Sequence, residues 1–334
     1  MRRITALALI VMLTLSISTP AFADFQYSET SKITGGMMVG SMKVLGAFSK
    51  DARKVTQPKN TTISVKGNKM RREEDDGKAE IWDLDGRRII HLDAKSQTYY
   101  SVTFDEMRAQ MEEARKKAAE QQNKHKGKDG DAQVKMTPKI KITPGAGTKK
   151  LLGHTAKEVK VRIDMEMEST DPKTRGQSGA MWTSSDEWLA PVTGYDEMKH
   201  FNMRLAREFE WLPGEVFGGN AQMAPAMAEL RKNSVKLEGM PLLMNTSVGF
   251  SGTGQPGQSP QAEQSGNPLS KGIGGLFGKK KKKDDDAQQP AEAGSTTGSL
   301  MDMTVEVTAV STSKLDAGLF GIPAGYKQVE PKRK

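Results

Sequence analysis

Apolar and charged residues alternate along the stretch from Lys149 to Glu168, most regularly from Val159 onward. Successive side chains of a β-strand point to opposite faces, so this alternation predicts a strand with one apolar and one charged face. Such a strand belongs in an antiparallel sheet that has water on one side. The stretch from Met301 to Ala309 repeats the pattern. The apolar positions are Val159, Val161, Ile163, Met165 and Met167 in the first stretch and Met301, Met303, Val305, Val307 and Ala309 in the second.

Short runs of strand-forming residues, separated by turn residues, fill the first third of the chain. We expect turns at Gly67-Asn68 and at Asp85-Gly86, the latter a strong signal for a two-residue hairpin. Strands joined in this way are antiparallel neighbours in chain order. The expected strands cover residues 24–34, 61–65, 69–73, 79–84, 87–92, 97–103, 134–142, 180–190 and, in two pieces, 235–250, with a turn at 144–147 before the strand that residues 149–168 form.

Two or three amphipathic helices interrupt the strands. Thr103 and Glu106 form a capping box, after which apolar residues recur at helical spacing to about Gln122. Thr193 and Asp196 begin a second helix. Its apolar stripe comprises Tyr195, Met198, Phe201 or Asn202, Leu205 and Phe209, and a third, shorter helix over residues 225–232 carries Met227 and Leu230.

The N-terminal segment has the features of a secretory signal peptide. Arg2 and Arg3 precede an apolar run, Pro20 interrupts the run, and residues 21–23 supply the small residues that a signal peptidase recognises. Cleavage there makes Asp24 the first residue of the mature chain. The run is shorter than the roughly 20 apolar residues of a transmembrane anchor. We therefore expect export to the periplasm, with the extracellular space as the open alternative.

The composition narrows the possible functions. The chain has no cysteine, which excludes disulfides, thiol catalysis, thiolate metal sites and a lipidated cysteine. Its formal charge is +9, of which Arg2 and Arg3 contribute two, leaving +7 after cleavage. A basic chain suits nucleic acid or an anionic membrane surface. Export favours the membrane surface, so no nucleic-acid partner is expected.

Residues 251–299 consist mostly of Gly, Ser, Gln, Pro and charged residues. Such a composition cannot repay the entropy of ordering. We expect a disordered insertion within one domain, because the alternating strand after it has no partner of its own. The expected organisation is a signal peptide at 1–23, a curved-sheet domain at 24–250, the insertion at 251–299, the final strand and closing segment of the same domain at 300–330, and a basic tail at 331–334.

Several short stretches resemble a known family. They are residues 66–103 (with KGNKMRRE, AEIWDLDGRRIIHLD and QTYYSVT), 149–161 (KKLLGHTAKEVKV), 187–191 with Trp188, 239–242 (GMPL) and 319–326 (LFGIPAGY). Together they resemble exported bacterial domains of unknown function related to the lipoprotein-localisation carriers. The resemblance implies a LolA-like open half-barrel of about eleven antiparallel strands, with a few helices in its mouth and a concave face that receives acyl chains. It carries over no catalytic or binding residue.

No pattern in the sequence indicates catalysis. Gly252, Gly254 and Gly257 form a G-x-G-x-x-G, but Pro256 lies inside it and no helix is expected after it, so it fails as a dinucleotide loop. No stretch supplies even two members of a nucleophile, base and orienting group. We expect neither an enzyme nor a cofactor. The histidines, which show no metal-ligand spacing, are His91, His125, His154 and His200.

The methionines leave one alternative open. Met165 with Met167, and Met301 with Met303, place thioethers two residues apart on one face of a strand, which suits Cu(I). Methionine is also a flexible apolar residue that suits a surface adapting to different ligands. We favour this second interpretation and expect no metal site, because each pair continues a stripe that needs apolar residues anyway.

These observations predict a mainly β protein. Its strongly curved antiparallel sheet, an open half-barrel, has two or three short helices on the concave face and binds a lipid or a lipoprotein acyl chain there. Each buried methylene of an acyl chain contributes about 0.8 kcal/mol. The expected lining residues are Val161, Ile163, Met165, Met167, Met301, Met303, Val305 and Val307 on strands and Met198, Phe201, Leu205 and Met227 on helices acting as a lid.

A lysine run in the insertion, beside apolar residues, suits an anionic membrane surface. An alternative function belongs to another class: a structural or adaptor component of the cell envelope, with a filled concave face, that acts through its outer surface and this basic insertion. The oligomeric state stays open. The lysine run in the insertion comprises Lys279, Lys280, Lys281, Lys282 and Lys283.

Overall fold

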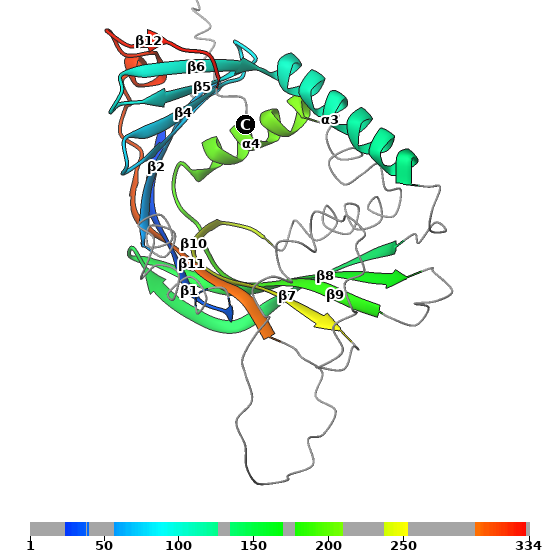
Figure 1. Ribbon diagram of the computed structural model, residues 1–334. Helices are drawn as coiled ribbons and strands as arrows, with labels where there is room; N and C mark the ends of the chain where they lie inside the picture. Colours follow the sequence, from blue (N-terminus) through cyan, green and yellow to red (C-terminus); the bar gives the residue numbers. More distant parts are fainter. Residues whose placement is uncertain are drawn as a thin grey trace, which may run out of the picture.

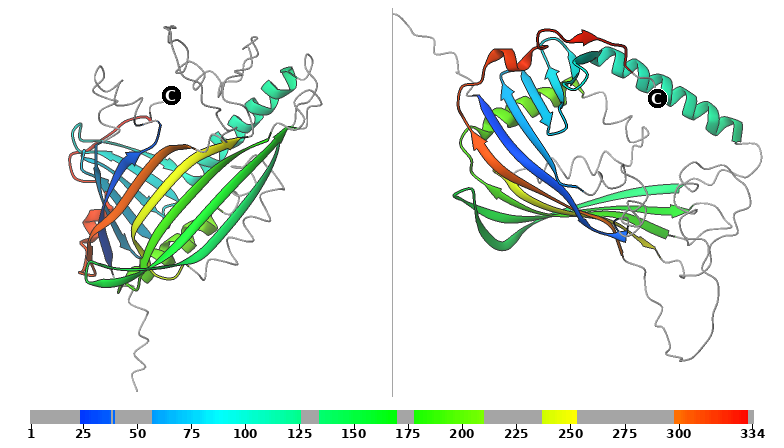
Figure 2. Two further views of the ribbon diagram at one scale, coloured as in Figure 1. Left: turned by 90° about the horizontal axis from the view of Figure 1, so that it is seen from below. Right: turned by 60° about the vertical axis from the view of Figure 1, so that its left-hand side comes forward.

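One large, strongly curved sheet dominates the computed structural model, which describes residues 24–37, 39, 57–125, 134–169, 178–209, 237–252 and 298–331 (Figure 1). The sheet has twelve strands in the order β12-β6-β5-β4-β3-β2-β1-β11-β10-β9-β8-β7, and every neighbouring pair is antiparallel except β12 with β6. Its curvature gives the sheet a concave and a convex face, and the space on the concave side is called the hollow below; β12 and β7 form the two edges of the sheet (Figure 2). The predicted mainly β fold, a curved antiparallel sheet with few helices, is confirmed.

The strands follow the alternating and turn-bounded stretches of the sequence. Strand β11 enters the sheet between β1 and β10, so the alternating segment near the C-terminus pairs with the first strand of the same sheet. The bounds are β1 Phe25–Gly35, β2 Lys59–Lys66, β3 Lys69–Glu74, β4 Lys78–Asp83, β5 Arg88–Asp93, β6 Thr98–Thr103, β7 Val134–Leu151, β8 His154–Ser169, β9 Ser178–Ala190, β10 Met240–Gly252, β11 Gly298–Ser311 and β12 Lys327–Gln328.

The hairpin between β4 and β5 forms where Asp85-Gly86 predicts it, but its turn differs from the expected two-residue turn. Four residues, 84–87, connect the strands, and Arg87 rather than Gly86 has a positive φ, of 49°. The Gly86 N–H donates to the Asp83 carboxylate at 3.0 Å. An aspartate that accepts a hydrogen bond from the backbone three residues ahead favours this longer turn.

Strand β7 corrects the predicted turn at residues 144–147. The strand continues through this segment and takes up the extra residues as an irregularity in its pairing with β8, between Pro144 and Thr148. The reversal comes later, at Leu152-Gly153, where both residues have positive φ, as a two-residue hairpin turn requires. Residues 149–151 therefore belong to β7, and the central strand begins at His154.

Two helices are described, and the sequence predicted both. Helix α3 (Phe104–His125) begins at the expected capping box: the Thr103 N–H donates to the Glu106 carboxylate at 2.7 Å, and the Glu106 N–H donates to Thr103 Oγ1 at 3.1 Å. It ends at His125, three residues beyond the expected end at about Gln122. Helix α4 (Tyr195–Glu208) lies inside the curve of the sheet (Figure 1). The third expected helix, at 225–232, falls outside the described residues.

The main core includes residues of α4 and of the concave face of the sheet. Phe201 and Met198 of α4 pack among apolar side chains from the concave face of the first strands, and both helix residues are buried. The core extends to Leu242 of β10 and Val307 of β11. Helix α4 therefore closes the concave face over β1, β2 and the strands beside them. The strand residues of this core include Phe25, Ile63, Val65 and Ile89.

The convex face over β4 and β5 corrects the expectation of a sheet that is wet on one side. Ile81, Ile90 and Leu92 point away from α4 and are buried beneath the C-terminal segment, whose 3₁₀ helix η3 (Ala317–Phe320) contributes Phe320. The convex face of this part of the sheet is therefore buried as well as part of its concave face. Ile81 of β4 and Ile90 of β5 lie opposite each other. The sequence of this stretch, IWDLDGRRII, does not alternate strictly between apolar and polar residues.

Candidate functional site

The concave face over β8 to β11 is the candidate site. Residues directly opposite in neighbouring antiparallel strands share a face, and three such steps connect the two alternating segments. Ile163 of β8 lies opposite Thr183, Thr183 lies opposite Val248, and Val248 lies opposite Met301 of β11. The apolar sides of both segments therefore lie on one face of one sheet.

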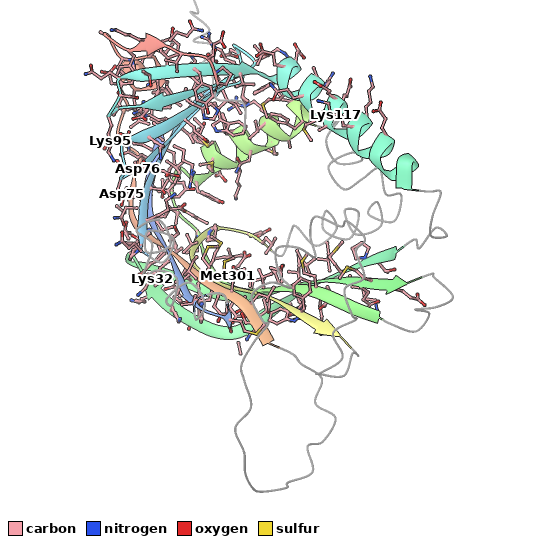
Figure 3. All side chains as sticks on the ribbon, in the orientation of Figure 1. Lys32, Asp75, Asp76, Lys95, Lys117 and Met301 are labelled. Atoms are coloured by element: carbon pink, nitrogen blue, oxygen red, sulfur yellow. The ribbon has the colours of Figure 1, made fainter. Side chains whose placement is uncertain are left out.

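This shared face is the concave one. Val307 lies on the same side of β11 as Met301, Met303 and Val305, and it lies opposite Glu29, on the side of β1 whose Phe25 ring contacts Tyr195 of α4. Met301 projects from the inner side of β11 (Figure 3). The pattern of β8 and β11 therefore directs its apolar side chains toward the hollow and its charged ones outward.

The predicted lining residues fall into three groups. One group is closed off in the core, and its members are Met198, Phe201, Val305 and Val307. A second group is half-buried and includes Leu205 of α4, which packs at the rim of the core; its other members are Val161, Ile163, Met165, Met167, Met301 and Met303. Met227 and the lysine run at residues 279–283 fall outside the described residues.

The apolar face also includes residues that the sequence analysis missed. Met181 of β9 lies opposite Met165, and Phe250 of β10 lies opposite Met181, so three strands carry one apolar row. Met181 and Phe250 are 39% and 40% exposed. In the sequence, the alternation of apolar and polar residues around Met181 is not recognisable, because the apolar residues Trp182 and Trp188 occupy the other face of β9. Both tryptophans are buried there, beneath Arg162 and Lys149 respectively, whose cationic groups lie 4.5 and 4.1 Å from the ring centroids.

Nearer the hairpin of β7 and β8, the same face becomes a small closed cluster. Ile142, Val159 and Leu189 are buried, and Val161 packs against them. The exposure of the apolar face therefore increases along β8, from buried Val159 to half-buried Met165 and Met167. The accessible apolar surface lies at the end of these strands that carries the methionines.

The opposite wall of the hollow, over β3 to β6, is polar and borders a cavity of about 810 Å³. Its charged groups are largely paired with one another: Arg72 with Glu74 at 3.1 Å, and His91 with Glu80 at 3.3 Å. The His91 ring also stacks on Tyr100, with centroids 4.5 Å apart. The hydrogen bond from His91 lowers the pKa of Glu80. Paired charges of this kind point to no particular ligand.

Two carboxylates on the concave face are held in poorly hydrated surroundings. Burial raises the pKa of Glu29, and the nearby Arg72 guanidinium opposes part of the rise. Burial likewise raises the pKa of Glu187, and a hydrogen bond from Ser185 opposes it. Burial also raises the pKa of Tyr195, and the charge of Glu187 adds to the effect.

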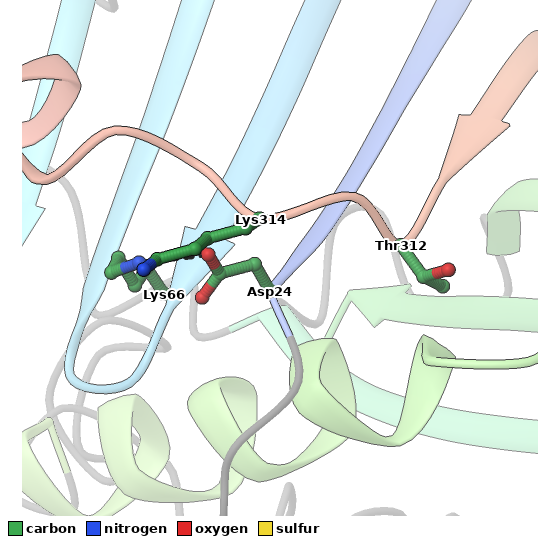
Figure 4. Close-up of a pocket in the computed structure, with 4 residues that line it drawn as sticks. All are labelled: Asp24, Lys66, Thr312 and Lys314. Atoms are coloured by element: carbon green, nitrogen blue, oxygen red, sulfur yellow. Dashed lines mark hydrogen bonds and ion pairs between the residues drawn. The ribbon is translucent and has the colours of Figure 1, made fainter.

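A second, smaller cavity of about 310 Å³ lies between the start of β1 and the C-terminal segment that follows β11. It is bordered by Asp24, Lys66, Thr312 and Lys314 (Figure 4). The Lys66 ammonium donates to the Asp24 carboxylate at 2.7 Å and to the Leu315 carbonyl at 2.9 Å. The Asp24 carboxylate also accepts the Leu315 N–H. These bonds tie the start of β1 to the C-terminal segment, so the cavity is explained as part of a structural junction.

Within the described ranges, no group of three or more His, Asp or Glu side chains is arranged to hold a metal ion. Among the helices of that same part of the chain, none combines the length and apolarity needed to cross a bilayer. The comparisons with known proteins add no assignment: no protein-family model, no curated protein and no solved structure matches this chain.

Proposed function

We propose that this protein binds a lipid, or another ligand that carries an acyl chain, on the apolar part of its concave face, without catalysis. One observation carries the proposal: the half-buried apolar side chains of β8 and β11, from distant parts of the sequence, share one face with Met181 and Phe250 of the strands between them. An acyl chain laid across these strands would cover apolar surface that otherwise meets water.

The residue types on this face suit such a ligand. Methionine adapts its three rotatable bonds to irregular apolar shapes, and four lining positions, Met165, Met167, Met301 and Met303, are methionines. Each methylene of the ligand that is buried contributes about 0.8 kcal/mol, so a chain of roughly ten carbons would supply several kcal/mol before ordering costs. Met198 and Phe201 would join the lining only if α4 moves away from the sheet.

The signal-peptide pattern of the first 23 residues makes the periplasm the proposed place of action. The ligand is then a membrane lipid or the acyl chain of a lipoprotein. A soluble carrier must shield that chain from water during transfer, and a concave apolar face that is partly covered by a helix can do so.

The proposal is tested by mass spectrometry of organic extracts from the purified, cleaved protein. We expect an acyl-bearing compound that co-purifies with the wild type and is reduced in the double variant Met301→Gln, Met303→Gln. The control is Glu306→Gln, which places the same amide on the convex side of the same strand, where Glu306 is exposed. Repeated absence of lipid from the wild type, or equal amounts in all three proteins, would contradict the proposal.

The alternative function, an envelope adaptor, finds one supporting observation on the convex face. Uncharged polar side chains of β2, β1, β11 and β10 are joined there by hydrogen bonds across strands. An adaptor using this surface would contain no lipid and would tolerate the methionine variants. The bonded pairs are Gln26 with Ser64, Ser28 with Thr62, Thr30 with Asn60, and Thr304 with Asn245, at 2.7–3.0 Å.

A further inference from the structure

Three methionines come together on the concave face of β8 and β9, and a fourth, Met136 of β7, occupies the position opposite Met167. Met165 and Met181 are directly opposite each other, and Met167 occupies the next position on the same face of β8. The residue of β9 opposite Met167 is Gly179, which has no side chain to fill the space beside it. Met165 and Met167 are half-buried, and Met181 is 39% exposed.

The spacing permits the three sulfur atoms to meet. Side chains directly opposite each other have Cβ atoms about 5 Å apart, and diagonal neighbours are about 7–8 Å apart. A methionine side chain extends far enough, with three rotatable bonds, to close such gaps. The Met181 thioether can therefore meet those of Met165 and Met167 without a change in the backbone.

The surroundings of the cluster are apolar. Phe250 lies opposite Met181 on one side, and Pro138 lies opposite Met165 on the other. The charged residues of this part of β8, Asp164 and Glu166, alternate onto the opposite face. A neutral group of thioethers with apolar neighbours disfavours hard divalent cations, which prefer oxygen ligands, and suits the soft monovalent ion Cu(I).

We propose that Met165, Met167 and Met181 form a three-coordinate thioether site for Cu(I). This combination differs from the one that the sequence suggested. Met301 and Met303 lie on β11, which is three strand intervals from β8, or about 14 Å at the usual spacing between strands. They cannot bind the same ion as Met165, and they provide a matched control on the same face.

The test measures Cu(I) binding to the whole chain that remains after signal-peptide cleavage. Binding is measured by competition with a chromophoric Cu(I) chelator, without oxygen and with ascorbate as reductant. We expect one Cu(I) per chain with submicromolar affinity. The variant Met165→Leu, Met181→Leu should bind at least about tenfold more weakly, since even the loss of an outer partner of a metal ligand costs about 10- to 100-fold. The variant Met301→Leu, Met303→Leu should bind like the wild type.

Wild-type binding no tighter than micromolar, or equal weakening in the two double variants, would overturn the proposal. A second measurement needs no substitution: in protein labelled with ¹³C at the methionine methyl groups, the redox-inert ion Ag(I) should shift the signals of Met165, Met167 and Met181 before those of Met301 and Met303. Simultaneous shifts of all five would also overturn it. The two proposals fail separately, because lipid binding is scored by acyl compounds in extracts of the wild type and of Met301→Gln, Met303→Gln, a measurement that involves no copper.

Discussion

At the scale of single residues, burial separates two roles for apolar side chains on the same helix. Phe201 of α4 is fully buried between the helix and the sheet, whereas Met203, two positions later, is 54% exposed. The helical repeat directs these two residues to different sides. Phe201 therefore stabilises the packing of α4 against the concave face, and Met203 contributes little to it.

Replacing Phe201 by alanine should lower the free energy of unfolding by about 3–5 kcal/mol, because the substitution removes a large buried side chain and leaves a cavity. Urea unfolding followed by circular dichroism measures the change. The control, Met203→Ala in the same helix, should stay within about 0.5 kcal/mol of the wild type. Equal effects of the two substitutions would mean that α4 is not docked on the sheet.

The carboxylate of Glu187 should affect stability in a pH-dependent way. Burial raises the pKa of Glu187 in the folded protein. The folded state therefore gains stability from the protonated carboxyl group below the ordinary glutamate pKa of about 4.3. This contribution is lost as the pH rises through the pKa of the folded state. Glu187→Gln should therefore be more stable than the wild type at neutral pH, and the difference should shrink toward pH 4.

Unfolding midpoints measured between pH 4 and pH 8 test this expectation. The glutamine keeps an acceptor for the Ser185 hydroxyl, so the comparison isolates the charge. Glu306→Gln on the exposed, convex side of β11 serves as the control. A difference between Glu187→Gln and the wild type that grows on acidification would contradict the assignment.

At the scale of elements, local signals in the sequence were sufficient for most strands, for the start of α3 and for the hairpins. The capping box at Thr103 and Glu106 forms as expected because its hydrogen bonds involve residues three apart. The turn predicted at 144–147 was wrong because Pro144 and two nearby glycines also suit a strand irregularity, and only the pairing with β8 distinguishes the two. The resulting long edge strand is protected from further pairing by its prolines and exposed lysines, such as Pro138 and Lys139.

Two glycines with positive φ should respond differently to alanine. At Gly67, in the turn between β2 and β3, φ is +57° and a Cβ would meet nothing within 4 Å, so Gly67→Ala should cost about 1–2 kcal/mol for the left-handed backbone alone. At Gly36, after β1, φ is +95° and a Cβ would collide with the Leu300 carbonyl oxygen. Gly36→Ala should therefore cost more.

Urea unfolding of the two glycine variants gives the comparison. A smaller loss for Gly36→Ala than for Gly67→Ala would show that the end of β1 is not packed against β11 as described.

At the scale of the whole molecule, the contacts that the sequence could not reveal are those between distant segments. Alternation in β8 and β11 predicts two faces but does not say which one is concave, and only the strand order brings both segments to one hollow. Similarly, nothing local in LDAGLFGIPAGY indicates that Phe320 covers Ile81 and Ile90 on the convex side. The apolar candidate site was only partly predictable from the sequence, because Met181 and Phe250 join it only through the pairing of β8, β9 and β10.

The covering of the convex face by the C-terminal segment predicts that Phe320→Ala destabilises the whole sheet. The side chain is 4% exposed, so we expect a loss of about 3–5 kcal/mol in a single cooperative unfolding transition. Ile322→Ala, two residues later and 38% exposed, should change stability by less than about 1 kcal/mol. Near-wild-type unfolding of Phe320→Ala would mean that the segment packs loosely.

The central claim, that the apolar concave face binds an acyl chain, is tested most directly by titrating ¹³C-methyl-methionine protein with a long-chain lysophospholipid below its micelle concentration and following the methyl signals. The account predicts saturable shifts at Met165, Met167, Met301 and Met303, with the exposed Met203 of α4 unaffected. Shifts confined to Met203 and other methionines away from this face, or no saturable shift at the four lining methionines, would contradict it.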